Sequence, residues 1–221
     1  MLGDALNLLL FLTIPATALL FFGMIIYYRL KQNQARHQRW DKAAQTLGLE
    51  HDFKPTAFGQ RPGPMTGTRD GFHVCVHTFT RGSGKSARSF TSIEVTPASS
   101  LDLGLNITPE RFLTRVDKAL GTQDIQIGDK TFDDTFLIQG NDPNQVRAVL
   151  TPTARQQLLA LHKRKPTLKV NDGGTYQEWQ GIITNAKRLD VLINEHIALV
   201  SQITQAQSTH IMSQQHAKAL A

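Results

Sequence analysis

Residues 72–97, FHVCVHTFTRGSGKSARSFTSIEVTP, decide the fold of this 221-residue chain. Apolar and polar residues alternate in 72–80 and again in 89–97, and both runs are rich in β-branched and aromatic side chains. This pattern is typical of half-buried strands. The glycine-rich basic loop between them, RGSGKSAR, resembles the end of a phosphate-binding loop, but Phe79 stands where that motif needs glycine and a strand follows instead of a helix. The stretch therefore predicts a β-hairpin with a flexible basic loop.

Downstream of this hairpin, predicted strands alternate with predicted helices. A short strand is expected within 101–107, and two strand pairs are expected at 124–128 with 132–140 and at 167–171 with 175–180. Helices are expected after Thr108-Pro109, Asp142-Pro143 and Thr151-Pro152, because each dipeptide offers a polar N-cap followed by proline at the first helical position. Hairpins that alternate with helices predict an α+β domain with a mainly antiparallel sheet.

Upstream of the hairpin, residues 5–28 contain no charged side chain. About 20 helical residues cross the hydrocarbon core of a bilayer, so this segment predicts one transmembrane helix, preceded by a short external N-terminus at residues 1–4. The apolar run is longer than that of a signal peptide, and no small-residue cleavage site follows it.

Aromatic and basic residues mark the end of the predicted span. The expected membrane-interface residues are Tyr27, Tyr28, Arg29, Lys31, Arg36 and Arg39. Residues 29–42 carry five Lys or Arg against one Asp, a net charge of +4, whereas residues 1–28 carry −1 from Asp4. The positive-inside rule then places the N-terminus outside and the C-terminal domain in the cytoplasm. We also expect the basic flank to lie against anionic lipid headgroups.

Within the basic juxtamembrane region, residues 29–50, we expect a helix that either continues from the span or restarts after it. In 34–48 the apolar residues Trp40, Ala43, Ala44 and Leu47 share one helical face, and Gly48 is suited to end the helix. The soluble domain is then expected over residues 51–206.

A long C-terminal helix is expected from about Thr184. Its apolar residues recur with alternating spacings of four and three, which predicts either a helix packed across the domain's own sheet or a helix that associates with another chain. The candidates for contact with a partner helix are Leu189, Ile193, Val200 and Ile203. Beyond Ala206 the pattern decays, so residues 207–221 predict a polar tail that is frayed or disordered without a partner.

The sequence offers one weak metal-binding candidate and no clear catalytic group. His73, Cys75 and His77 alternate along one predicted strand and share a face, as an H-x-H metal site requires. The alternative is an amphipathic strand with Val74 and Val76 in the core. Cys75 is the only cysteine, which excludes an intramolecular disulfide. We expect no cofactor, and no nucleic-acid partner because the basic cluster at 162–165 lacks interleaved aromatic residues.

These features predict a non-catalytic, single-pass membrane protein of bacterial type. We expect an accessory or structural subunit that stabilises a respiratory, photosynthetic or secretion complex through contacts with other membrane-protein subunits. Two alternatives stay open. One is a membrane-tethered enzyme or metal-binding domain that uses the strand of His73, Cys75 and His77. The other is a sensor that binds anionic lipid or a ligand through the basic loop 81–88 and the cluster 162–165.

Overall fold

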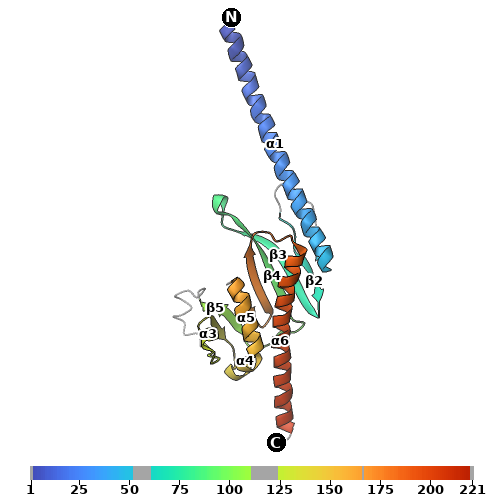
Figure 1. Ribbon diagram of the computed structural model, residues 1–221, viewed down its shortest axis with the longest axis vertical. Helices are drawn as coiled ribbons and strands as arrows, with labels where there is room; N and C mark the ends of the chain where they lie inside the picture. The colour runs from blue at the N-terminus through green and yellow to red at the C-terminus, as the bar shows by residue number, and fades with distance from the viewer. Residues whose placement is uncertain (1, 52–60, 111–123, 166, 220–221) are drawn as a thin grey trace.

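A computed structural model describes residues 2–51, 61–110, 124–165 and 167–219, with side chains described from residue 17 onward. The strands within these residues form one eight-stranded sheet in the order β1-β2-β3-β4-β8-β7-β5-β6, and every neighbouring pair is antiparallel. Two long helices, α1 and α6, project from opposite ends of the domain (Figure 1). The predicted α+β class with an antiparallel sheet and a long C-terminal helix is confirmed.

The strands are short except for the central hairpin. Their bounds are β1 Glu50–His51, β2 Met65–Arg69, β3 Phe72–Arg81, β4 Arg88–Thr96, β5 Asn106–Pro109, β6 Phe136–Gln139, β7 Lys169–Asn171 and β8 Gly174–Gln180. The helices are α1 Leu2–Leu47, α3 Lys130–Asp133, α4 Pro143–Val149, α5 Pro152–Arg164 and α6 Ala186–Ala219, with a short 3-10 turn, η1, at Gly84–Ser86.

The predicted β3–β4 hairpin is confirmed. The strands pair from His73 opposite Thr96 to Arg81 opposite Arg88. Val74 and Val76 are fully buried, so the alternation does place one face of β3 in the core. The hairpin of β7 and β8 is confirmed as well, with Asp172 and Gly173 as its two-residue loop.

A hairpin that the pattern analysis missed joins β2 to β3. Its loop is Asp70-Gly71, and both residues have positive φ, 50° and 82°. Such angles are required in the tight turns that suit the twist of antiparallel strands, and Asp-Gly is a favoured pair for them. The Asp70-Gly71 dipeptide is therefore a sequence signal for this hairpin.

Two helix starts are confirmed and one is wrong. The side chains of Asp142 and Thr151 accept hydrogen bonds from Asn144 N–H and Ala154 N–H, so they cap α4 and α5 as predicted. Thr108 instead lies in β5, where it pairs with Leu137 of β6. The remainder of that predicted helix, residues 111–120, lies outside the described residues.

The strand pair predicted around residues 128–130 is also wrong. Residues 130–133 form the short helix α3, because the Asp129 side chain accepts a hydrogen bond from Phe132 N–H and caps it. The Asp133 carboxylate accepts hydrogen bonds from Ile127 N–H and Gly128 N–H. These side-chain bonds occupy the backbone that a hairpin would have paired, and only Phe136–Gln139 remains as a strand.

The C-terminal end of α1 packs into the core of the domain, through the apolar face that the pattern in 34–48 predicts. Trp40, Ala43 and Ala44 are essentially inaccessible to solvent, and Trp40 Nε1–H donates to Gly63 O at 3.0 Å. Gly48, with φ of 67°, ends the helix in the left-handed conformation. Leu49 N–H then donates to Ala44 O at 2.9 Å, which completes a Schellman cap.

Helix α6 joins two hydrophobic clusters into one body. Leu189, Ile193 and Val200 pack with the end of α1 and strands β2–β4, whereas Ile203 packs with β5–β7, α4 and α5. All four proposed partner-helix residues are therefore buried in the chain's own core, and the internal packing is the arrangement that the structure has. The predicted polar tail continues α6 as helix to Ala219.

The predicted transmembrane segment falls within α1, although its residues 5–16 lie outside the described side chains. Within the part of the chain that is described, no helix has the length and apolar character needed to cross a bilayer.

Candidate functional site

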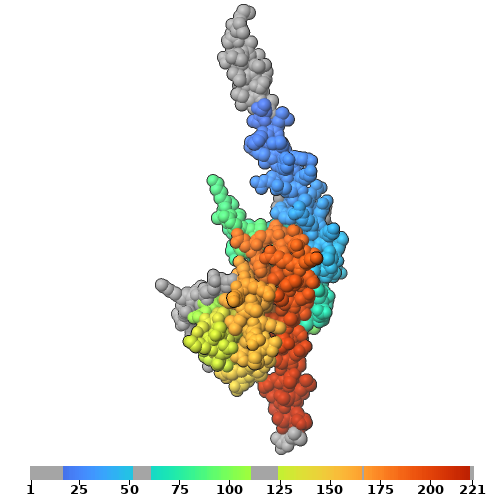
Figure 2. All heavy atoms as spheres, viewed as in Figure 1, coloured from blue at the N-terminus to red at the C-terminus, as the bar shows by residue number. Residues whose placement is uncertain are grey.

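The most unusual surface of the molecule is the part of α1 that stands outside the domain. Figure 2 shows the described portion of this helix rising clear of the sheet and of α6. Its large apolar side chains are open to solvent, with Leu20 75% exposed and Phe22 66% exposed. The exposed apolar residues of this segment are Leu19, Leu20, Phe21, Phe22, Met24, Ile25, Ile26, Tyr27, Tyr28 and Leu30. Contiguous apolar surface of this kind marks contact with a membrane or a partner.

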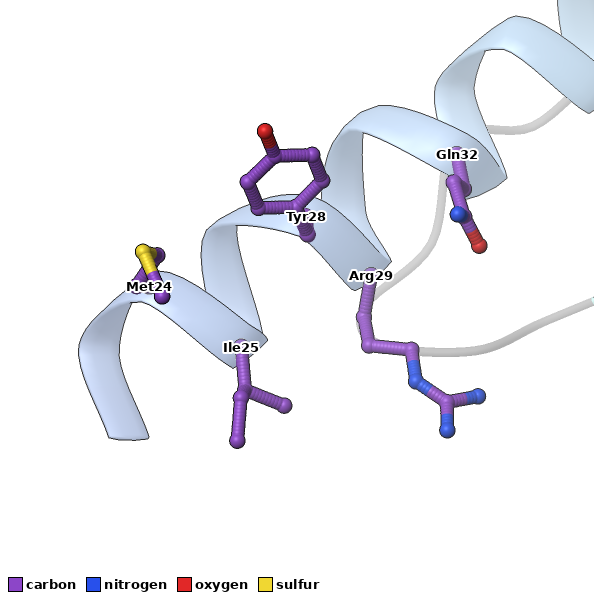
Figure 3. A pocket seen from close by; sticks show the side chains of 5 residues that line it. All are labelled: Met24, Ile25, Tyr28, Arg29 and Gln32. Carbon is purple, nitrogen blue, oxygen red and sulfur yellow. The ribbon is translucent and has the colours of Figure 1, made fainter. Parts of the chain in front are cut away.

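The apolar segment ends where the predicted interface residues begin. Met24, Ile25 and Tyr28 line a surface depression together with Arg29 and Gln32 (Figure 3). Apolar and basic side chains thus meet within little more than two helical turns. Tyr27 and Tyr28 are both about 60% exposed, and their rings form an edge-on pair. Amphipathic rings beside a cationic group are typical of a boundary between hydrocarbon and water.

Four basic residues, here called the basic collar, follow on the next turns of α1: Arg29, Lys31, Arg36 and Arg39. Arg29, Arg36 and Arg39 line a second depression on one side of the helix. Lys31 and Arg39 are exposed, and Arg36 is half-buried with its guanidinium donating to Asn33 Oδ1. The collar occupies the stretch between the apolar segment and Trp40, where the helix enters the core.

The three metal-binding candidates do share one face of β3, as their alternation predicts. They lie on the face of the sheet opposite α6, with His73 exposed and Cys75 and His77 half-buried. His77 Nδ1 lies 2.9 Å from Ser92 Oγ. Cys75 sits opposite Glu94, and burial, with a smaller effect of that carboxylate, raises the pKa of the thiol. Over the described residues, no three His, Cys, Asp or Glu side chains converge on a common metal position.

On the same face, beside β3, lies a cluster that sequence reasoning missed. Arg81 Nη2 donates to Glu178 Oε1 at 3.0 Å, and Tyr176 O–H donates to the same oxygen at 2.8 Å. The guanidinium also lies over the rings of Phe79 and Phe90, which stack with centroids 5.4 Å apart.

This aromatic–acidic cluster ties the base of the hairpin to β8. Burial and the Glu178 carboxylate both raise the pKa of Tyr176, so its hydroxyl stays a neutral donor. Phe79 and Phe90 are direct cross-strand partners, so the hairpin register alone could have placed those two rings together. The link to Glu178, 97 residues away in sequence, carried no local signal.

Within the basic cluster 162–165, Arg164 forms an ion pair inside the chain. Arg164 of α5 donates from one guanidinium nitrogen to both carboxylate oxygens of Glu195 on α6, at 2.5 and 2.6 Å. Both residues line a small depression between the two helices. This pair ties α5 to α6 and leaves less charge for an external ligand.

Comparison with known protein families, with curated proteins and with solved structures finds no match to this chain.

Proposed function

We propose that this chain is a non-catalytic, single-pass membrane protein that serves as an accessory subunit of a multi-subunit membrane complex. Residues 5–28 of α1 form the anchor, and the α+β domain lies in the cytoplasm against other subunits. The observation that carries this proposal is the continuity of α1. One helix runs from Leu2 to Leu47, with exposed apolar side chains in its free part and buried ones where it enters the core.

The exposed segment supports a lipid environment. Burying a large apolar side chain contributes roughly 1.5–3 kcal/mol of favourable free energy. Transfer of the exposed apolar side chains between Leu19 and Leu30 from water into lipid is therefore strongly favourable. The uncharged sequence continues from residue 17 back to residue 5, which gives the helix the length that a bilayer core requires. Most backbone groups within a helix bond to one another, which lets a helix cross lipid. Pro15 has no N–H, so the carbonyl of Phe11 lacks its usual helical donor, a loss that membrane helices tolerate when neighbouring groups satisfy the carbonyl.

Charge supports the proposed orientation. The collar carries the whole +4 charge of residues 29–42, since Asp41 and Lys42 cancel, against −1 for residues 1–28. A cytoplasmic excess of Lys and Arg within 15–20 residues of a span is what fixes topology in single-pass proteins. The domain that follows the collar is therefore assigned to the cytoplasmic side.

The junction between α1 and the domain supports a structural role. Trp40 is fully buried, and the small residues Ala43 and Ala44 let the helix approach its neighbours closely. A helix that enters the core without a break holds the domain at a set height and angle above the bilayer. At the other end, α6 extends beyond the domain and exposes Ile211 and Met212 (Figure 1), a surface that a neighbouring subunit can cover.

Alkaline carbonate extraction of membranes that contain the full chain tests the anchor. The test variant combines Leu19→Arg with Leu20→Arg, and the matched control combines Ile211→Arg with Met212→Arg; both add two charges at adjacent exposed apolar positions. Arginine near the centre of a span costs about 2.5–3.5 kcal/mol per residue. The wild type and the control should stay in the pellet, whereas the test variant should move to the supernatant. Extraction of the wild type by carbonate would refute the anchor.

Cross-linking in native membranes, followed by mass spectrometry of the adducts, tests the accessory role. We expect adducts from the domain surface and the end of α6 to defined membrane subunits. A monodisperse monomer after purification in mild detergent, with no adduct in native membranes, would contradict this part of the proposal.

A further inference from the structure

The tip of the β3–β4 hairpin is a compact basic projection. It comprises residues 81–88 and contains Arg81, Lys85 and Arg88 but no acidic residue. All of these residues except Ala87 are exposed. Arg81 is partly neutralised by Glu178, so Lys85 and Arg88 supply most of the free charge at the tip.

The tip has a defined conformation. Gly82 and Gly84 adopt positive φ, 86° and 55°, and η1, which begins at Gly84, forms one turn before β4. Ser86 Oγ donates to Ser83 O at 2.7 Å, and Arg88 Nη1 donates to Lys85 O at 3.0 Å. The cluster of Arg81 with Phe79, Phe90 and Glu178 fixes the stem below. The basic groups are therefore presented on a preformed support, which lowers the entropic cost of binding a ligand.

The hairpin and the free part of α1 start from the same level of the domain. Trp40 of α1 donates to Gly63 O, and the neighbouring carbonyl of Pro62 accepts a hydrogen bond from Thr78 Oγ1 of β3. Thr78 lies opposite Thr91, one residue from Phe90, where the pairing of β4 with β8 ends. Beyond this level, no other strand of the described residues pairs with the hairpin.

Both projections also run in the same direction and over similar lengths. Figures 1 and 2 show the hairpin tip reaching from the sheet toward the end of the molecule that carries the free part of α1. The eleven residues from Trp40 back to Arg29 span roughly 16 Å of helix at 1.5 Å per residue. The six residues from Thr78 to Gly84 span at most roughly 20 Å at 3.3 Å per residue. The tip therefore lies within the height of the collar, between the level of Arg39 and that of Arg29.

We propose that the β3–β4 hairpin tip is a second membrane contact, at which Lys85 and Arg88 bind the headgroups of anionic lipids. This inference rests on the proposed function, because the tip meets a bilayer only if α1 spans it. The preference for lipid over an acidic protein follows from position: the tip lies level with the predicted headgroup residues of α1. Each Lys or Arg near an anionic surface strengthens binding about fivefold, and the second contact restrains the tilt of the domain.

Lysine footprinting of the full chain in lipid nanodiscs tests this inference. Acetylation rates are compared at three lysines of the same molecule: Lys31 in the collar, Lys85 at the tip and Lys218 at the far end of α6. The nanodiscs are made either of phosphatidylcholine alone or of phosphatidylcholine with phosphatidylglycerol. A third arm adds inorganic phosphate to the zwitterionic discs, so that a free anion is distinguished from a lipid headgroup.

We expect Lys85 to react about fivefold more slowly in anionic discs than in zwitterionic discs, with Lys218 unchanged and Lys31 protected in both. The variant Ser83→Glu should abolish the protection of Lys85, whereas Ser213→Glu, with the same charge change on the distal part of α6, should leave it intact. Lys85 protection that is absent, independent of anionic lipid, or matched by phosphate would overturn the inference. If Lys31 alone is protected, the tip contact fails while the anchor stands. If neither lysine is protected, the proposed function fails as well.

Discussion

His196 offers a direct test of how α6 is held on the sheet. Its side chain is fully buried, with Nδ1 3.0 Å from Thr175 Oγ1 and Nε2 3.1 Å from Gln177 Oε1. The Gln177 amide nitrogen donates to Leu161 O and Lys165 O, so Oε1 is left to accept from His196 Nε2–H. The network therefore suits a neutral imidazole whose Nδ1 accepts from Thr175. Burial lowers the pKa of His196 from 6.5 to about 4.

This shift makes folding stability depend on pH in a defined direction. Between pH 6.5 and about 4, the unfolded chain binds a proton at His196 that the folded chain does not bind. The contribution of the neutral side chain is therefore complete above pH 6.5 and is lost as the pH falls toward 4. At 1.36 kcal/mol per pH unit, the full loss is about 3 kcal/mol, and the loss between pH 7.5 and pH 5 is about 2 kcal/mol.

Urea unfolding of the full chain in detergent at these two pH values measures the loss. Trp179 packs edge-on against His196 at 6.0 Å, so tryptophan fluorescence reports on this part of the core. The variant His196→Gln keeps a donor and an acceptor but cannot titrate, and it should lose about 2 kcal/mol less than the wild type on acidification. His216→Gln, on the exposed end of α6, should behave as the wild type. If His196→Gln and the wild type lose equal stability between pH 7.5 and pH 5, the reasoning is refuted.

Two further substitutions test other parts of the architecture. Trp40→Ala should reduce the free energy of unfolding by about 3–5 kcal/mol, because it removes a fully buried ring at the junction of α1 with the domain. Thermal unfolding followed by circular dichroism measures this loss. An unchanged melting temperature would show that the junction is not packed as described. Asp172→Ala should cost roughly 2–4 kcal/mol, because this carboxylate accepts hydrogen bonds from the backbone N–H groups of Leu103, Gly104 and Leu105. Faster amide hydrogen exchange confined to residues 103–105 would confirm the local cause, and unchanged exchange there would contradict it.

The parts of the fold that could be predicted from the sequence are those governed by short-range signals. Alternation in 72–80 and 89–97 placed β3 and β4 almost to the residue, since one buried face imposes a period of two. The pairs Asp142-Pro143 and Thr151-Pro152 marked the starts of α4 and α5, because both the cap and the fixed φ of proline act locally. For α6, the sequence predicted the helix itself, but its spacing left open whether the helix packs on the domain's own sheet or on another chain.

The parts that could not be predicted depend on partners far away in sequence or on side-chain bonds to the backbone. Thr108-Pro109 has the form of a helix start, yet pairing with Leu137 and Phe136 draws it into β5. The carboxylates of Asp129 and Asp133 favour α3 over a turn through bonds that alternation cannot reveal. The position of β8 beside β4, which creates the contact of Arg81 with Glu178, is likewise a property of topology.

The order of the sheet explains how the candidate membrane-facing groups act together. Because β8 lies beside β4, Glu178 is available to hold Arg81 and thereby the stem of the hairpin. Helix α6 packs over β4 and β8 and also against α1, so the same sheet holds the end of α1 next to the collar in place. The hairpin tip and the collar therefore share one rigid support, although 46 residues separate Arg39 from Lys85 in sequence. Under the proposed membrane contact, a bilayer that binds the collar would present its surface to the tip without any rearrangement of the domain, and the binding energy of the second contact would set the tilt of the domain.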